Sequence, residues 1–494
     1  MSRFAIACGH QRTAAAAEAV LNDGGNAADA AIAAALMTMA AEPVLAGLLG
    51  GGFAMVASGG KTELLDFFVQ TPRTKADEID FRSVHADFGS VTQEFHIGAG
   101  AIATPGIAVG LAELHQRCGR VPFRELAAPA IQAAREGVEI TPYQARLGRI
   151  ISPILMASPE MRALMCDDDG PLPAGTPQRN PEFADVLEVY GLEGPRFVME
   201  GEVGQALIAL AREGGHLTAG DLKAYLPRWR RPLVCSRGAA QLNLNPAPSL
   251  GGVLIALALD LMPGSASVVE TANAFAATSK ARTQTGDEPR LLLAPDLIER
   301  LRKTLARHPA STRGTTHISV IDQAGMGVAL TLSNGEGCGM VVPGTGIAPN
   351  NMLGEEDLVP GGWHSWAPDT RLASMMCPLA VRWPDGRIAI LGSGGSNRIR
   401  TALAQVLAHL IDRDMPLENA ILSPRLHVEG ERLDFEETDL AEQDRLALLD
   451  AFPDALGWAE PSMFFGGVHA AMRAANGSLT AAGDPRRDGL ALVV

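Results

Sequence analysis

The sequence predicts an α/β fold, and three observations support that prediction. The alanine-rich stretch that follows Asn26 has the small side chains of a helix packed closely against a sheet. From Thr315 to Asp322 apolar and polar residues alternate, as in a half-buried strand. Two apolar runs flank Pro384-Asp385-Gly386-Arg387, which is the pattern of a β-hairpin. A chain of 494 residues with 47% hydrophobic residues has the material for two to four domains or for one large α/β body.

Charge and hydropathy exclude several classes of partner. The formal net charge is −15, which argues against a nucleic acid or an anionic membrane surface. No stretch reaches the roughly 18 consecutive apolar residues of a membrane span, because the run from Ala31 to Ala41 contains Thr38 and ends at Glu42-Pro43. The first twenty residues are too polar for a signal peptide. We therefore expect a soluble, cytoplasmic protein that acts on a small molecule.

The metal and cofactor signals are weak throughout the chain. The six cysteines lie far apart without ligand spacing, which favours reduced thiols over disulfides or a zinc site. The acidic run Asp167-Asp168-Asp169 lacks the spacing of a calcium loop and is better interpreted as a solvated loop. The glycine-rich stretch 47–53 precedes a strand but lacks the GxGxxG spacing, so close backbone approach is the better interpretation. We expect no metal and no cofactor.

The remaining pattern gives an order of elements. Residues 281–314 are polar and rich in Arg, Thr and Pro, which indicates an exposed segment that could be cut. The residues after 314 are richer in strand-like alternation than those before. We expect helices at 13–21, 26–41, 106–137, 253–261 and 401–412, and strands at 54–57, 63–69, 315–322, 328–332, 379–383, 388–391 and 467–472.

Thr315, at the very start of its strand, suggests a specific chemistry. If the peptide bond between Gly314 and Thr315 is cut, Thr315 gains a free α-amino group beside its own hydroxyl. That amine can take the hydroxyl proton, which makes the oxygen a nucleophile. The plainer alternative is that a β-branched residue simply suits the start of a strand. The stretch alone does not distinguish the two.

Eleven stretches taken together resemble the γ-glutamyltranspeptidase family of N-terminal-nucleophile hydrolases, and they follow the family's order from end to end. The resemblance implies a four-layer αββα sandwich that cleaves itself before Thr315. The fragments would be residues 1–314 and 315–494, held together as a heterodimer and open to further oligomerisation. The stretches are DGGNAADAAIAAAL (23–36), GLLGGGF (47–53), TPG (104–106), PAIQAAREGVEI (129–140), GGHLTAGDLKAY (214–225), PAPSLGG (246–252), TTHISVID (315–322), VVPGTGIAPNN (341–351), GSGGSNR (392–398), SPRLHVEG (423–430) and GDPRRDG (483–489).

The resemblance assigns the catalytic roles. Thr315 would be the nucleophile, and a hydroxyl residue downstream would assist it. Thr331 and Ser333 are the two candidates, and we favour Ser333, although a turn residue before Asn334-Gly335 would read the same. Gly394 and Gly395 would supply backbone N–H groups to an oxyanion hole, since glycine lets such donors approach closely. A strand-to-helix turn explains these two glycines equally well.

The substrate-binding residues match the family only in part. Asn334 and Glu355 resemble the contacts to the substrate α-amino group. The family places two adjacent serines on the α-carboxylate, and here the pair reads Ala373-Ser374, so only Ser374 remains. The residues that would bind the substrate α-amino group are retained, whereas those that would bind the α-carboxylate are reduced in number.

The largest departure is at Phe68. The family holds the substrate α-carboxylate with an arginine directly after an Asp-Phe pair; here that pair is Asp66-Phe67 and Phe68 follows. Arg73 lies five positions later and is the candidate replacement. A charge-assisted contact of this kind contributes about 1.5–3 kcal/mol, so its loss would weaken glutathione binding about tenfold to a hundredfold.

These observations predict an autoprocessed amide hydrolase or acyltransferase of the γ-glutamyltranspeptidase type. It would cleave γ-glutamyl or related small acyl amides through an acyl-enzyme formed on the threonine nucleophile. Two alternatives stay open. One is a branch of the family that acts on cephalosporin side chains or oxamate-like amides. The other is an unprocessed, inactive relative that only binds such ligands. His317, two residues after Thr315, is expected to form structural hydrogen bonds rather than to take part in catalysis.

Overall fold

Two antiparallel sheets stacked face to face form the centre of the molecule. The computed structural model describes residues 3–87, 92–285, 292, 314–359 and 362–494. The first sheet has the order β10 (Arg228–Arg230), β3 (Lys61–Phe67), β2 (Gly51–Ser58), β14 (Gly327–Ser333), β13 (Thr316–Ile321), β1 (Ala5–Cys8) and β22 (Leu490–Val493). The second has the order β11 (Leu233–Arg237), β12 (Ala240–Leu244), β15 (Leu379–Arg382), β16 (Ile388–Gly394), β20 (Gly467–Arg473) and β21 (Leu479–Ala482).

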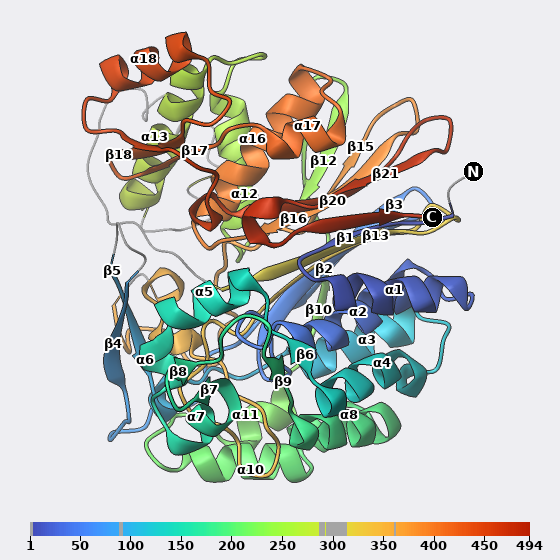
Figure 1. Cartoon of the computed structure of the whole chain (residues 1–494), viewed down its shortest axis with the longest axis vertical. Coiled ribbons are helices and arrows are strands. Elements are labelled where there is room, and N and C mark those ends of the chain that lie inside the picture. The colour runs from blue at the N-terminus through green and yellow to red at the C-terminus, as the bar shows by residue number, and fades with distance from the viewer. Residues whose placement is uncertain (1–2, 88–91, 286–291, 293–313, 360–361) are drawn as a thin grey trace.

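Helices cover the outer face of each sheet, so the αββα prediction is confirmed (Figure 1). Below the first sheet lie α1 (Gln11–Asn22), α2 (Ala27–Ala41), α3 (Ile107–Cys118) and α4 (Phe123–Glu136), with α8 (Pro181–Glu193) behind α4. Above the second lie α12 (Gly251–Leu261), α13 (Val268–Thr285), α16 (Arg398–Asp412) and α17 (Leu417–Leu422). No described helix combines the length and the apolar character that a membrane span needs.

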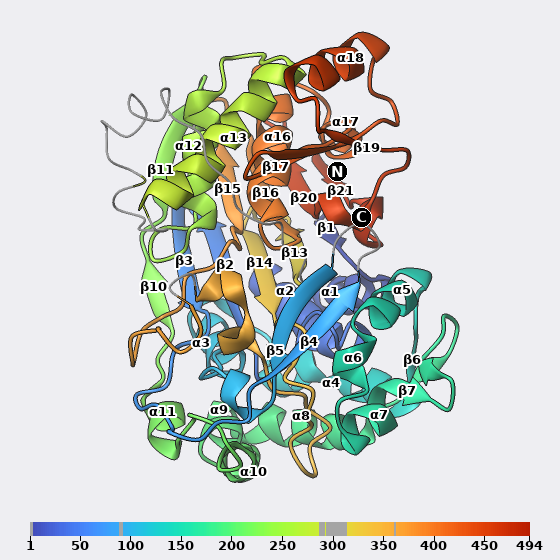
Figure 2. The same cartoon turned by 90° about the vertical axis from the view of Figure 1, so that its left-hand side faces the viewer.

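Smaller elements lie above, below and beside the two stacked sheets, as the rotated view shows (Figure 2). The short sheets are β17 (Leu426–Glu429), β18 (Arg432–Glu436) and β19 (Leu456–Trp458); β4 (Arg82–Asp87) and β5 (Thr92–Ile97); β6 (Val138–Glu139) and β9 (Pro177–Gln178); β7 (Cys166–Asp167) and β8 (Gly170–Pro171). The other helices are α5 (Pro142–Ile150), α6 (Ser152–Leu155), α7 (Pro159–Met165), α9 (Pro195–Met199), α10 (Glu202–Ala211), α11 (Ala219–Ala224) and α18 (Glu442–Ala451), with 3₁₀ turns η1 (Ala99–Ala101), η2 (Met352–Gly354), η3 (Glu356–Leu358), η4 (Met463–Phe465) and η5 (Pro485–Arg487).

Strand alternation divides the core into two parts. In β2, Phe53 and Met55 point into the space between the sheets, whereas Ala54 and Val56 point toward the alanine-rich α2. The helix begins where the sequence predicts, because Asn26 and Asp29 form a capping box. The small side chains of α2 are almost all buried, as close packing on a sheet requires.

Several predicted boundaries were wrong at glycine runs. Gly51 and Gly52, and likewise Gly392 to Gly394, belong to strands β2 and β16 rather than to turns. They are glycines because another chain segment lies against them: a Cβ on Gly392 would come within 2.3 Å of the His317 ring. The polar segment expected to be exposed begins inside α13, where Ala281 is buried, and residues 286–291 and 293–313 lie outside the described residues.

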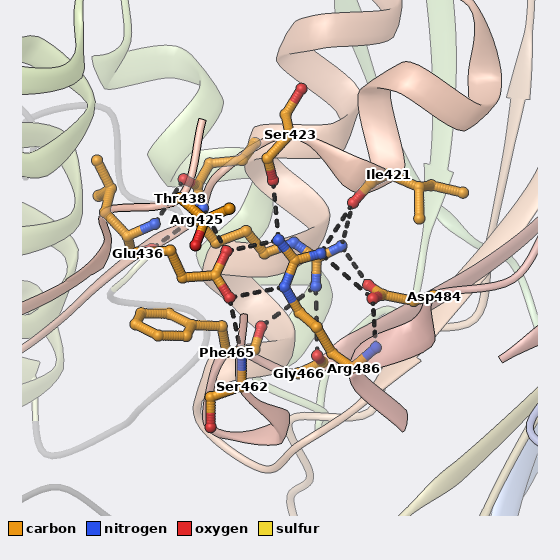
Figure 3. Close-up of polar contacts among 12 residues, drawn as sticks. Ile421, Ser423, Arg425, Glu436, Thr438, Ser462, Phe465, Gly466, Asp484 and Arg486 are labelled. Atoms are coloured by element: carbon orange, nitrogen blue, oxygen red, sulfur yellow. Dashed lines mark hydrogen bonds and ion pairs between the residues drawn. The ribbon is translucent and has the colours of Figure 1, made fainter. Parts of the chain in front are cut away.

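A buried ionic cluster fixes the C-terminal segment to the β17–β18 hairpin and to the end of α17 (Figure 3). Arg486 forms hydrogen bonds of 2.5 and 2.7 Å with the two oxygens of Glu436 and one of 3.2 Å with Asp484. Arg425 contacts the other oxygen of Asp484 at 2.5 Å. All four side chains are buried, and both cations also donate to backbone carbonyls, so each charge is compensated by protein groups.

Candidate active site

Thr315 lies directly before β13, a strand of the first sheet. It shares its sheet face with His317, two residues along the strand, and this face looks toward β16. The side chain is buried, and its Oγ1 donates a hydrogen bond of 2.8 Å to the carbonyl oxygen of Gly314. The hydroxyl of Thr315 is therefore held beside the peptide group that the sequence marks for cleavage.

Ser333, at the end of β14, contacts the same carbonyl. The register pairs Thr316 with Leu332, which brings the next residue of β14 level with Thr315. Ser333 Oγ donates to the Gly314 oxygen at 2.9 Å and accepts from Gly335 N at 3.1 Å. Of the two hydroxyl candidates, only Ser333 lies beside Thr315, because the Thr331 hydroxyl lies 2.8 Å from the Nδ1 atom of His317.

Glu336 is a further contact that sequence reasoning missed. Its Oε1 accepts a hydrogen bond of 2.7 Å from Gly314 N. Two residues at the end of β14 and in the turn after it thus hold both polar groups of Gly314: Ser333 contacts the C=O and Glu336 contacts the N–H. An acid three residues after a serine carries no recognisable signal in the sequence alone.

Gly394 and Gly395 close the site from the second sheet. A Cβ on Gly394 would lie 2.1 Å from the Thr315 carbonyl oxygen, so no other residue fits there without moving Thr315. Gly395 has φ of +122°, which favours glycine for a second reason. The buried Arg487, also missed, lies against both glycines and donates a long hydrogen bond of 3.5 Å to the Thr315 carbonyl.

A pocket with an empty volume of about 370 Å³ opens beside Thr315. Four residues expected to bind substrate or to assist catalysis line it: Ser333, Glu355, Ser374 and Phe68. Its apolar wall consists of Phe68, Met352, Leu358, Met375, Met376 and Ile399. Among the lining residues that the structure describes there is no Lys, Arg or His.

Two residues expected at the substrate lie elsewhere. Arg73 is half-exposed and its Nε lies 3.4 Å from Asp369, outside the lining of the pocket. Asn334 follows Ser333 but its side chain turns the opposite way, packing on Gly47 and donating to Ala348 O at 3.1 Å. In this arrangement neither side chain reaches an acyl group bound beside Thr315.

The basic residues near Phe68 are also engaged elsewhere. Asp66 accepts a 2.7 Å hydrogen bond from Arg230 and lies 3.7 Å from Arg371. Arg371 also donates to the backbone oxygens of Phe68 and Leu226. These two arginines contact the end of β3 and are not among the residues that line the pocket.

Burial controls the protonation of two groups beside the nucleophile. It lowers the pKa of His317 well below the usual range, and His469 nearby lowers it further, so a neutral imidazole bridges Thr331 and Ser319 as expected of a structural residue. Burial, reinforced by the charge of Asp488, raises the pKa of Glu42 to about 8, although Thr316 opposes the shift with a hydrogen bond. Within the described ranges no group of three or more His, Cys, Asp or Glu is placed to hold a metal.

Comparison with known proteins gives one consistent family. The family model of gamma-glutamyltranspeptidase matches residues 13–494. The acylase ACY 1 proenzyme of Pseudomonas sp. (strain V22) is 31% identical over 474 residues, covering 88% of this chain and 84% of the relative. The glutathione hydrolase proenzyme of Pseudomonas aeruginosa is 28% identical, covering 86% and 82% respectively.

Solved structures agree on the fold. The cephalosporin acylase of Bacillus halodurans superposes with a TM-score of 0.85 at 23% identity, over 99% of this chain and 96% of that one. The gamma-glutamyltranspeptidase of Pseudomonas nitroreducens gives a TM-score of 0.51 at 24% identity, over 61% of this chain and 94% of that one. The architecture is thus that of the N-terminal-nucleophile hydrolases of this group.

Proposed function

Because the chain belongs to the gamma-glutamyltranspeptidase family, we propose that it is an autoprocessed amide hydrolase that cleaves small acyl amides through Thr315. The observation that carries the proposal is the geometry at Gly314. Its carbonyl oxygen accepts from both Thr315 Oγ1 and Ser333 Oγ, at 2.8 and 2.9 Å. The nucleophile and a polarising donor therefore converge on one peptide group in the uncut chain.

Maturation follows from that arrangement. Thr315 Oγ attacks the Gly314 carbonyl carbon, the C–N bond breaks, and the Thr315 nitrogen leaves as a free amine with the hydroxyl proton. Water then hydrolyses the ester, which leaves a carboxylate on Gly314. The hydrogen bond from Ser333 stabilises the negative charge that develops on the carbonyl oxygen. The fragments 1–314 and 315–494 would remain together as a heterodimer, in line with the proenzyme names of the relatives.

Turnover repeats the chemistry on a substrate. The Thr315 amine accepts the hydroxyl proton as the oxygen attacks the amide carbonyl, and the proton then passes to the leaving amine. Gly394 and Gly395 would direct backbone N–H groups at the oxyanion, a role supported by the close approach of Gly394 to the Thr315 carbonyl and by the position of Gly395 directly after it. Water, or an acceptor amine, would release the acyl group and regenerate the hydroxyl.

Two observations favour the acylase branch over glutathione hydrolysis. Phe68 occupies the place of the expected carboxylate-binding arginine and forms part of the apolar wall. The 31% identical relative is named an acylase. An apolar acyl pocket suits a substrate that lacks the α-carboxylate of a γ-glutamyl group.

Intact mass and N-terminal sequencing test the proposal. Purified protein is expected to contain two chains, the smaller beginning with Thr315. The Thr315→Ala variant should remain a single chain without amidase activity, because it lacks the attacking oxygen. Thr315→Ser keeps that oxygen and is the matched control, expected to mature and to retain activity. A wild-type protein that stays uncut after prolonged incubation would contradict the proposal and leave the interpretation as a binding protein.

A further inference from the structure

Another cavity lies in the helical layer above the second sheet, and it plays no part in the function proposed above. Its empty volume is about 570 Å³, and residues of α13, α16, β17 and β18 line it. Among the described residues, none lines both this cavity and the pocket beside Thr315. Ser265 and Arg413 of the lining are exposed, so the cavity reaches the surface at these residues.

Arg425 contributes an unpartnered donor to the cavity lining. It is buried within the ionic cluster of Figure 3, where its Nη2 binds Asp484 and the carbonyl of Ile421. Its Nη1 donates to the carbonyls of Phe465 and Gly466. Its Nε has no hydrogen-bond partner among the described residues. Since Nε can only donate and an unpaired buried donor is unfavourable, this atom requires an acceptor from a bound molecule.

The N-terminus of α13 lies at the same cavity. Ala266 and Val268, at the start of this 18-residue helix, belong to the lining. The first N–H groups of a helix carry a partial positive charge, which favours an anion. Glu270, the acid of the first turn, lies outside the lining and accepts hydrogen bonds from Ser267. The helix end and the Arg425 donor therefore favour the same kind of ligand.

The acids of the lining are neutralised by arginines that lie outside it. Asp412 accepts hydrogen bonds of 2.5 and 2.9 Å from Arg237. Glu436 accepts hydrogen bonds of 2.5 and 2.7 Å from Arg486. Arg413 donates to a backbone carbonyl and forms no ion pair with any acid that the structure describes. The charge that remains in the lining is thus positive.

His409, on the last turns of α16, adds a second unpartnered atom to the lining. Its Nδ1 has no hydrogen-bond partner within the described part of the chain. Burial lowers the pKa of His409 to about 4, and the charges of Arg413 and Arg425 lower it further, although Asp412 opposes the shift. The ring is therefore neutral at neutral pH, and one of its tautomers presents Nδ1–H as a donor.

Apolar side chains form much of the remaining lining, which makes the cavity amphipathic. They are Val268, Ala408, Leu426, Phe435, Leu440 and Leu448. A ligand that matches these surroundings has an anionic, hydrogen-bond-accepting head and a short apolar body.

We propose that this cavity is a separate small-molecule site that binds a monocarboxylate with a short, unbranched apolar chain, such as hexanoate. The carboxylate accepts from Arg425 Nε and lies at the N-terminus of α13. The chain packs against Leu426 and Phe435. Binding at this site does not depend on cleavage before Thr315 or on amidase activity.

Calorimetry with three six-carbon compounds tests the chemistry of the head group on the purified wild-type protein. Hexanoate, 1-hexanol and hexylamine share the chain and differ in charge. Hexanoate is expected to bind about tenfold to a hundredfold more tightly than 1-hexanol, because it makes a charge-assisted hydrogen bond. Hexylamine should bind most weakly, because its ammonium meets Arg425 and Arg413.

Three variants test the location. Arg425→Lys keeps the cation beside Asp484 but removes the Nε donor, and should weaken hexanoate binding at least about tenfold. Arg413→Gln changes an exposed residue outside the ionic cluster, so it tests the site even if Arg425→Lys fails to fold; it should weaken binding about threefold. Ala408→Phe fills part of the cavity and should abolish binding. Arg196→Gln, on the exposed face of α9, is the matched control and should bind hexanoate like the wild type.

Three results would overturn the inference. One is the absence of saturable hexanoate binding, and another is 1-hexanol binding as tightly as hexanoate. The third is hexanoate binding that stays unchanged in the folded Arg413→Gln and Ala408→Phe variants, which would place the bound acid elsewhere, for example beside Thr315. None of these results bears on the proposed amidase, which chain cleavage and amide hydrolysis test separately.

Discussion

Two buried regions of this molecule differ in whether acidic and basic side chains occur together. In the cluster of Arg425, Glu436, Asp484 and Arg486, two acids meet two cations at 2.5–3.2 Å. In the pocket beside Thr315, the described lining contains an acid and no cation. The first region compensates its charges with its own side chains, which stabilises the position of the C-terminal segment. No two of the described residues that line the second carry opposite charges.

Breaking the balanced cluster should have the largest effect. Arg486→Met removes one cation and leaves Glu436 buried without its 2.5 Å partner. We expect a loss of about 3–5 kcal/mol in the free energy of unfolding, the cost of an uncompensated buried charge. Urea denaturation in the uncut Thr315→Ala background, where the protein is one chain, measures it.

The control for that variant lies at the surface. Arg196 pairs with Glu200 at 3.5 Å with its side chain 85% exposed, and Arg196→Met should change stability by less than about 0.5 kcal/mol. If both substitutions change the free energy of unfolding equally, the buried ion pair contributes no more to stability than the exposed one.

Glu42 sharpens the comparison, because it is a buried acid near the nucleophile with a pKa raised to about 8 by burial and by Asp488. An unfolded glutamate titrates near 4.5, so between these values the folded chain holds a proton that the unfolded chain releases. Stability is therefore full below about pH 4.5 and falls as pH rises toward 8. Glu42→Gln cannot titrate, so relative to its parent it should gain roughly 2–3 kcal/mol between pH 5 and pH 7.

Denaturation at the two pH values measures this gain, again in the Thr315→Ala background. Glu193→Gln, an exposed acid on α8, is the matched control and should show no change in pH dependence. A Glu42→Gln variant whose stability follows pH in parallel with its parent would show that Glu42 is ionised in the folded protein at neutral pH.

The smallest expected effect comes from adding a cation to the described lining of the pocket, which contains none. Phe68→Arg should raise the kcat/KM for γ-glutamyl 4-nitroanilide relative to that for 4-aminobutyryl 4-nitroanilide, which is the same compound without its α-carboxylate, by one to two decades, about 1.4–2.7 kcal/mol. Phe68→Leu keeps the wall apolar and should not shift the ratio. Arg73→Ala should also leave it unchanged, because Arg73 lies outside the pocket; a lost γ-glutamyl activity in that variant would restore Arg73 to the site.

Local sequence signals were sufficient for the type of several elements, whereas the αββα layering was expected from the family resemblance. The capping residue Asn26, the hairpin around Asp385 and the alternation after Thr315 each gave an element of the right type. The glycine runs gave wrong strand boundaries. Gly51 and Gly392 are glycines because segments distant in the chain pack against them and leave no room for a side chain. Secondary-structure propensity reflects only residues that are close in sequence, so it cannot detect contacts made with other strands.

Site residues could be predicted where a sequence motif fixes the backbone. Prediction was poorer where the direction of a side chain determines whether the residue faces the pocket. Thr315 and Ser333 meet at Gly314, and Glu355, Ser374 and Phe68 share one pocket. The Asn334 side chain points away from the pocket, because successive residues leaving a strand point to opposite sides, and its contact with the substrate stays a prediction. Glu336 and Arg487 gave no signal, because their partners are backbone atoms of Gly314 and Thr315.

The strand order of the first sheet constrains the two fragments that cleavage before Thr315 would create. Counted across that sheet, β10, β3 and β2 come from the first fragment, β14 and β13 from the second, β1 from the first and β22 from the second. The fragments are interwoven, with β1 hydrogen-bonded on both edges to strands of the other chain. Separating them means dismantling the sheet itself, so dissociation and unfolding become a single event, and dilution alone cannot exchange one fragment for another.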